Sequence, residues 1–154
     1  MVKPDRSRAY FIGREGNIVI VDLKGRRALG KWKLEAPDGR LIAHAVAISG
    51  DGKTVVVGFE APGESNGFYA SEVRAYSLDN YTDTEPRFPT AEPRHVATIA
   101  LAHPAIDIAV SRDGGLLYAA GVRSRTLAVY DAVTGDLLHT FEDLGEAPSQ
   151  IIVP

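Results

Sequence analysis

Apolar residues along this chain occur in short runs separated by Gly, Asp, Asn and Pro, and a helical period of hydrophobic positions is almost absent. Short apolar runs bounded by turn-forming residues are typical of β-strands. The predicted strands cover residues 8–13, 17–23, 28–34, 41–49, 53–59, 71–78, 95–101, 105–111, 115–121, 126–132, 137–144 and 149–153. Because these runs leave hardly any room for a helix, the predicted class is all-β.

The predicted strands recur in a fixed order. Residues 44–59 (HAVAISGDGKTVVVGF) match residues 106–121 (IDIAVSRDGGLLYAAG), and residues 17–32 match residues 126–141. Units of four strands that recur at a spacing of roughly 40 residues are typical of the blades of a β-propeller. Lettered a to d from the centre outward, the strands run b-c-d, a-b-c-d, a-b-c-d and a final a.

The predicted architecture is therefore a set of β-propeller blades, about three four-stranded antiparallel sheets. They form one domain over residues 1–154. The units extend approximately over residues 8–34, 41–101 and 105–144, and a final inner strand covers residues 149–153. Such a chain is a partial propeller or half of a six-bladed ring.

One segment, AISGDGKTVVVG at residues 47–58, differs from a phosphate-binding loop only by Ala at its first position. A phosphate-binding loop needs a helix after Lys-Thr, whereas Lys53-Thr54 are followed by valines that favour a strand. The matching repeat has Gly115 and Leu116 in place of Lys and Thr. Ser-x-Asp-Gly between apolar runs is a turn signal, so the segment is predicted to be a hairpin.

Two segments interrupt the repeat, at residues 60–70 and 79–95. Both are rich in Pro, Gly and acidic residues and are predicted to be surface loops. Long loops on one blade are a usual place for features particular to one propeller.

Residues 109–141 (AVSRDGGLLYAAGVRSRTLAVYDAVTGDLLHTF) resemble the YVTN-type and WD40-like propeller repeats. Residues 8–23 also look like the blade sequences of the haem d1 propeller of cytochrome cd1 nitrite reductases. Propellers of these kinds have roughly six to eight blades, and this chain has strands for about three. Either two copies join head to tail into a six-bladed ring, or the chain is a fragment of a longer propeller. The strand order fits both.

Composition narrows the function classes. The formal net charge is −3, which gives no electrostatic footprint for nucleic acid or an anionic membrane. The chain has no cysteine, which excludes disulfides, thiolate ligands and cysteine nucleophiles. No membrane span is predicted. The expected compartment is the cytoplasm, or the periplasm if a signal peptide has been removed.

Five residues are candidates for ligand binding. His44 and Asp107 lie on predicted innermost strands, where polar side chains line a propeller channel. Arg14, Arg123 and Arg125 lie on predicted b–c turns of one rim, where they could attract an anionic ligand. The competing interpretation of the inner-strand residues is a polar side chain at a strand end whose hydrogen bonds are already made. The competing interpretation of the arginines is a solvated hairpin tip. No catalytic set or cofactor is predicted. No metal site is predicted either, because no histidine pair has metal-ligand spacing.

Two functions follow. The first is a non-enzymatic scaffold that binds a protein or peptide, or a second copy that completes the ring. The alternative is an enzyme or cofactor-binding domain, lactonase-like or haem d1-like, with its site at the central channel of a completed ring. The non-enzymatic role is favoured, because the chain has a repeat architecture, an ordinary charge and no recognisable catalytic set.

Overall fold

The computed structural model describes residues 6–13, 17–34, 43–60, 69–78, 93–121, 123–146 and 148–153, which contain eleven strands and no helix. The first sheet consists of β1 (Arg8–Ile12), β2 (Asn17–Asp22) and β3 (Arg27–Lys33). The second consists of β4 (Ala43–Ile48), β5 (Thr54–Phe59), β6 (Ala70–Ser77) and β7 (Arg94–Ala105). The third consists of β8 (Asp107–Val110), β9 (Leu116–Gly121), β10 (Thr126–Asp131) and β11 (Leu137–Phe141).

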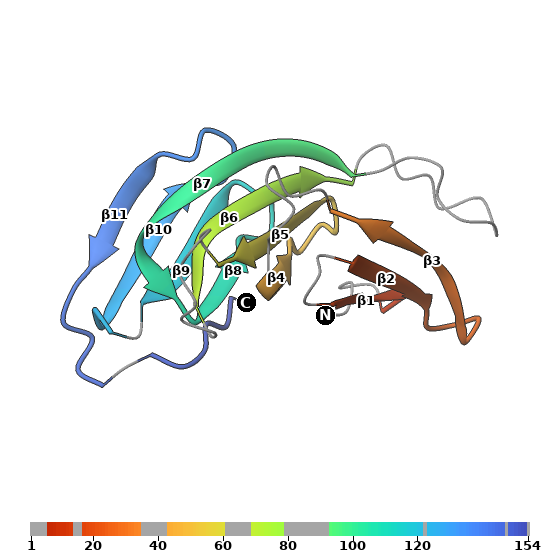
Figure 1. Cartoon of the computed structure of the whole chain (residues 1–154), viewed down its shortest axis with the longest axis horizontal. Helices are drawn as coiled ribbons and strands as arrows, with labels where there is room; N and C mark the ends of the chain where they lie inside the picture. Colours follow the sequence, from red (N-terminus) through yellow and green to blue (C-terminus); the bar gives the residue numbers. More distant parts are fainter. Residues whose placement is uncertain are drawn as a thin grey trace.

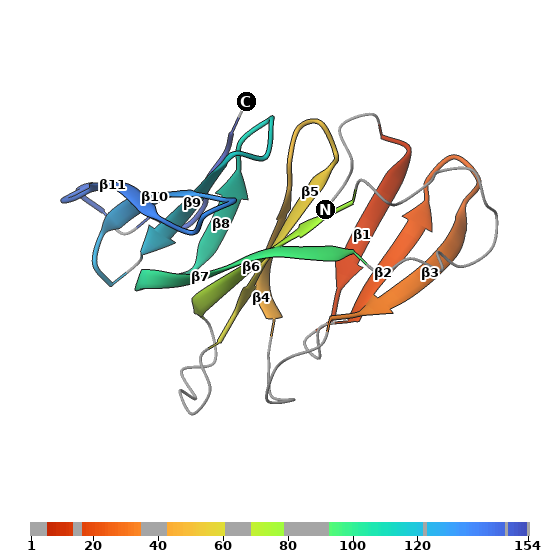
Figure 2. The same cartoon turned by 90° about the horizontal axis from the view of Figure 1, so that it is seen from above.

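Within each sheet every strand pairs antiparallel with its neighbour in the sequence. The three sheets stand side by side, with the second between the other two (Figure 2). The last strands of the sheets, β3, β7 and β11, follow the outer side of an arc, and β4 and β8 lie on its inner side (Figure 1). This is the arrangement of consecutive propeller blades and confirms the all-β prediction.

The second sheet is covered on both faces, and β5 shows why its sequence is apolar without alternation. Successive side chains of a strand point to opposite faces. Val57 and Phe59 therefore pack in the core shared with the first sheet, whereas Val56 packs in the core shared with the third. All three side chains are fully buried.

Each sheet-to-sheet core is built from alternate residues of neighbouring blades. The core between the first and second sheets contains Tyr10, Ile18, Ile20, Leu29, Leu34, Ala43, Val55, Val57, Phe59, Tyr76 and Leu78. The core between the second and third sheets contains Ala45, Val56, Val73, Ala75, Ala97, Ile99, Ala105, Ile108, Val110, Leu117, Ala119, Ala128, Tyr130 and Ala132.

The two Ser-x-Asp-Gly segments are hairpin turns of the same geometry. Ser49 Oγ donates to Asp51 Oδ1 at 2.6 Å, and Ser111 Oγ donates to Asp113 Oδ1 at 2.6 Å. The glycine that follows each Asp has a positive φ, 74° at Gly52 and 79° at Gly114. The turns also join adjacent blades, because the Asp51 N–H donates to the Arg112 carbonyl at 2.8 Å. The hairpin prediction for residues 47–58 is confirmed.

Two strand predictions are wrong. Residues 149–153 form no strand, because a strand needs a ladder partner and β1, the matching b strand, belongs to the sheet at the far side of the row (Figure 2). β7 extends to Ala105 instead of ending at residue 101, since Ala105 pairs with Ala70 after a break in register. Most of the two long loops, residues 61–68 and 79–92, lies outside the described residues.

Candidate functional site

The structure brings four of the five predicted site residues to one end of the second and third sheets. β4 begins next to His44, β8 begins at Asp107, and Arg123 and Arg125 belong to the turn between β9 and β10. Asp107, at the start of β8, pairs with Ala120 near the end of β9, so it lies at the same end of the sheet as the β9–β10 turn. β7 passes directly into β8 at this end. We term this end the β9–β10 rim. Arg14 lies outside the described residues.

His44 forms a buried contact with an acidic residue. The pairing of Ala43 with Phe59 brings the start of β4 beside the end of β5. His44 Nε2 therefore lies 3.4 Å from Glu60 Oε2, and the two side chains are only 10% and 7% exposed. The position on an inner strand was predicted from sequence, but the Glu60 partner was not, because it follows from the register of two strands.

Asp107 holds the C-terminal segment against the third sheet. Its Oδ2 accepts the backbone N–H of Ile151 at 2.8 Å. Residues 148–153 thus lie beside β8 without joining its ladder. This contact uses a carboxylate oxygen of Asp107 for chain positioning.

The two arginines of the β9–β10 turn have different contacts. The Arg123 guanidinium lies 5.4 Å from the centre of the Tyr69 ring, which belongs to the segment entering β6. Arg125 has a positive φ of 53°, and its Nη1 donates to the Gly145 carbonyl at 3.2 Å. Arg123 therefore reaches the second sheet, whereas Arg125 ties down the segment after β11.

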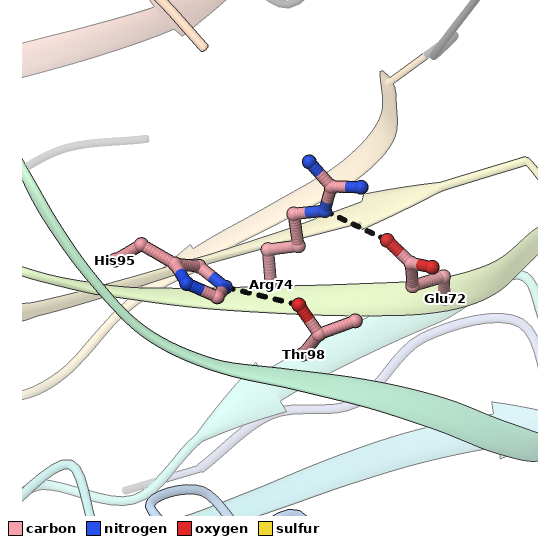
Figure 3. A network of polar contacts seen from close by, with 4 residues as sticks. All are labelled: Glu72, Arg74, His95 and Thr98. Atoms are coloured by element: carbon pink, nitrogen blue, oxygen red, sulfur yellow. Dashed lines mark hydrogen bonds and ion pairs between the residues drawn. The ribbon is translucent and has the colours of Figure 1, made fainter. Parts of the chain in front are cut away.

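A polar network on β6 and β7 was not predicted from sequence (Figure 3). Arg74 Nε donates to Glu72 Oε1 at 2.7 Å, and the guanidinium lies 5.6 Å from the Phe59 ring centre. His95 and Thr98 interact at 3.0 Å on the neighbouring strand. Burial raises the pKa of the nearby Tyr76 hydroxyl, and the positive charge of Arg74 opposes that rise. Alternation places Arg74 on an inward face, but no motif marks it.

The aspartates at the turns are structural. Asp131 accepts the backbone N–H groups of Val133 and Thr134 at 2.8 Å each, and Asp22 accepts that of Gly25 at 2.8 Å. These hydrogen bonds hold the pKa of both carboxyls below their usual range. Asp22 and Asp131 therefore cap their turns.

The residues that the structure describes contain neither a cluster of metal ligands nor a helix that could span a membrane. No group of three or more His, Asp or Glu side chains there is arranged to hold a metal ion. None of the described segments is a helix of the length and hydropathy required to cross a bilayer.

Solved structures similar to this chain are β-propellers. The Cps50 (Swd1) β-propeller domain of Myceliophteria thermophila gives a TM-score of 0.67 at 14% identity and covers 97% of this chain. The RRP9 WD40 repeats give a TM-score of 0.64 at 16% identity and cover 96%. This chain spans 44% and 38% of those two chains. The chain therefore has the fold of β-propeller blades, and at these identities the likeness shows the fold alone.

A second group of similar proteins consists of enzymes. The family described as methylamine dehydrogenase heavy chain (MADH) matches residues 88–154. The methylamine dehydrogenase heavy chain of Methylophilus methylotrophus is 39% identical over 61 residues, which are 39% of this chain and 15% of that protein. Kuenenia stuttgartiensis hydrazine synthase gives a TM-score of 0.64 at 16% identity, with this chain spanning 36% of it.

Proposed function

We propose that this protein is a non-enzymatic binding scaffold of WD40-like propeller blades, in which a second copy covers the outer sheet faces and the completed rim holds a protein partner. The observation that carries the proposal is the exposure of large apolar side chains on the first and third sheets. Exposed apolar surface of this kind marks interaction sites.

Two of these side chains, Phe11 and Phe141, lie on the faces turned away from the second sheet. Phe11 is 57% exposed and pairs with Val19, next to positions that pack inward. Phe141 is 48% exposed, pairs with Leu127 and contacts the His139 ring at 4.5 Å between ring centres. The second sheet, buried on both faces, shows how a blade is covered in this protein. Another blade is the matching cover for each outer face.

The molar mass in solution tests the assembly. Light scattering behind a sizing column, at low and high protein concentration, should give a stable mass of twice 16.5 kDa. A monomer at every concentration, or a polydisperse aggregate, would contradict a closed pair of copies. It would favour a sector whose outer faces are covered within a longer propeller.

A second candidate is a propeller enzyme or cofactor-binding chain with its site at the inner strands. The match of residues 88–154 to the methylamine dehydrogenase heavy chain favours it, and the buried His44–Glu60 pair supplies polar groups at an inner strand. Methylamine-dependent reduction of a redox dye, lost in His44→Gln but not in His95→Gln on the outer strand β7, would support this candidate. Absence of dye reduction and of visible absorbance in the purified protein would count against it.

A further inference from the structure

We infer that Arg123, with Tyr69 and His103, forms a binding site for the carboxylates of an acidic segment of a partner protein. The site lies on the β9–β10 rim at the junction of the second and third sheets. The inference rests on the proposed scaffold function and names the chemistry of the partner.

The position of Arg123 is the first observation. Its side chain is exposed in the turn between β9 and β10, yet the guanidinium is held 5.4 Å from the centre of the Tyr69 ring. A cation over an aromatic face is attracted by the ring quadrupole, which restricts the arginine without neutralising it. The guanidinium is therefore positioned in advance of binding, and its planar N–H groups suit a carboxylate.

The second observation is the absence of an internal counter-ion. Arg27 and Arg74 form ion pairs with Asp22 and Glu72, whereas Arg123 forms none with the residues that the structure describes. The exposed acidic residues after β11 belong to a segment that is tied to Arg125, through the bond of Leu144 N–H to the Arg125 carbonyl. Among the residues that the structure describes, no carboxylate therefore balances the charge of Arg123.

The third observation is the position of His103, which follows from a break in β7. Residues 101–104 leave the register with β6, and the Ala102 N–H donates instead to the Tyr130 hydroxyl at 2.8 Å. His103, which is exposed, then lies against Gly121. The missing side chain at Gly121 leaves space for the Ser124 and Thr126 hydroxyls, whose oxygens are 2.7 Å apart.

These groups fit a short acidic peptide better than a long polyanion. Arginine and tyrosine are the residues that most often anchor protein interfaces. The net charge of −3 opposes a long polyanion but leaves a local cationic spot. The partner is accordingly a protein segment in which one or two Asp or Glu side chains reach Arg123.

The test measures binding of a fluorescein-labelled Glu-Gly repeat peptide by fluorescence anisotropy. Arg123→Gln should weaken binding roughly tenfold, since a hydrogen bond to a charged group contributes on that scale. Arg112→Gln removes the same charge from an exposed residue at the opposite end of the sheets and should change binding by less than about twofold. Tyr69→Ala should weaken binding, and Tyr69→Phe, which keeps the ring, should not.

Equal losses in the Arg123 and Arg112 variants would overturn the site, because only net charge would then matter. Absence of peptide binding by the wild-type protein would also overturn it. A third outcome would overturn it as well: an oligothymidylate of equal charge binds as tightly as the peptide, and its binding depends equally on Arg123. Light scattering on each variant distinguishes failure of this peptide site from failure of the proposed scaffold. If the ring does not form, the mass of the wild-type protein shows it before any peptide is added.

Discussion

Gly58 lies on β5 where the second sheet faces the third, and an added Cβ there would come within 2.7 Å of the Ala70 Cβ. The side chains of Ala45 and Ile108 also lie 3.5 Å from that point. We therefore expect Gly58→Ala to lower the free energy of unfolding by about 1–3 kcal/mol, the usual cost of overpacking. Urea unfolding followed by circular dichroism measures the change.

Gly13→Ala is the control for that experiment. The nearest atom to its added Cβ is 3.6 Å away, an ordinary van der Waals contact. The free energy of unfolding of this variant should stay within about 0.5 kcal/mol of the wild type or rise slightly. Equal destabilisation of the two variants would show that the close approach of Ala70 to Gly58 does not restrict the side chain at that position.

The turn carboxylates make stability depend on pH in the acid range. The pKa values of Asp22, Asp113 and Asp131 are lowered in the folded chain from the ordinary value of 3.8. Their contribution to stability is therefore complete above the unfolded pKa and is lost as the pH falls through the folded pKa. We expect the urea midpoint to fall between about pH 5 and pH 2. Asp131→Asn should show a shallower fall, and identical pH curves would contradict the assignment.

At the scale of residues, local chemistry was predictable and contacts between strands were not. Ser49 and Ser111 bond to the aspartates two residues after them, so the local Ser-x-Asp-Gly pattern was enough to predict a turn. Arg123 was predicted to lie on a turn of the rim, but its contact with Tyr69 joins residues on different sheets. The His44–Glu60 pair likewise requires knowledge of the register between β4 and β5.

At the scale of elements, β5 stabilises two blade interfaces at once. Val56 and Val57 are consecutive, fully buried, and belong to different cores. Val56→Ala and Val57→Ala should each lower the free energy of unfolding by about 1.5–3 kcal/mol, through lost apolar burial and a cavity. In a strand covered on one face only, one of the two substitutions would be nearly neutral. Urea unfolding of the two variants distinguishes these cases.

The strand pattern predicted most elements because alternation and turn residues act locally. β9 and β10, for example, are predicted within one residue of their observed ends. The prediction was wrong for residues 149–153, whose apolar run is compatible with a strand but has no ladder partner beside it. It was incomplete for β7, where Tyr130 of another sheet takes the Ala102 N–H across the break in register.

At the scale of the whole molecule, the first and third sheets each expose one apolar face, and the two faces are different surfaces. A head-to-tail pair of copies would bury the first-sheet face of one copy against the third-sheet face of the other, twice. Phe11→Asp and Phe141→Asp should therefore each reduce the mass in light scattering from dimer to monomer. Val133→Asp, at an exposed apolar residue in the turn after β10, is the control and should leave the mass unchanged.

Mixing the two disrupted variants separates head-to-tail assembly from a symmetric contact of like faces. The Phe11→Asp protein keeps an intact third-sheet face, and the Phe141→Asp protein keeps an intact first-sheet face. One native interface can form between them, so the mixture should regain part of the dimer mass, with weaker affinity than the wild type. In an isologous dimer only one of the two substitutions would disrupt the contact. A mixture that stays monomeric although each variant is folded would therefore argue against pairing of these two faces.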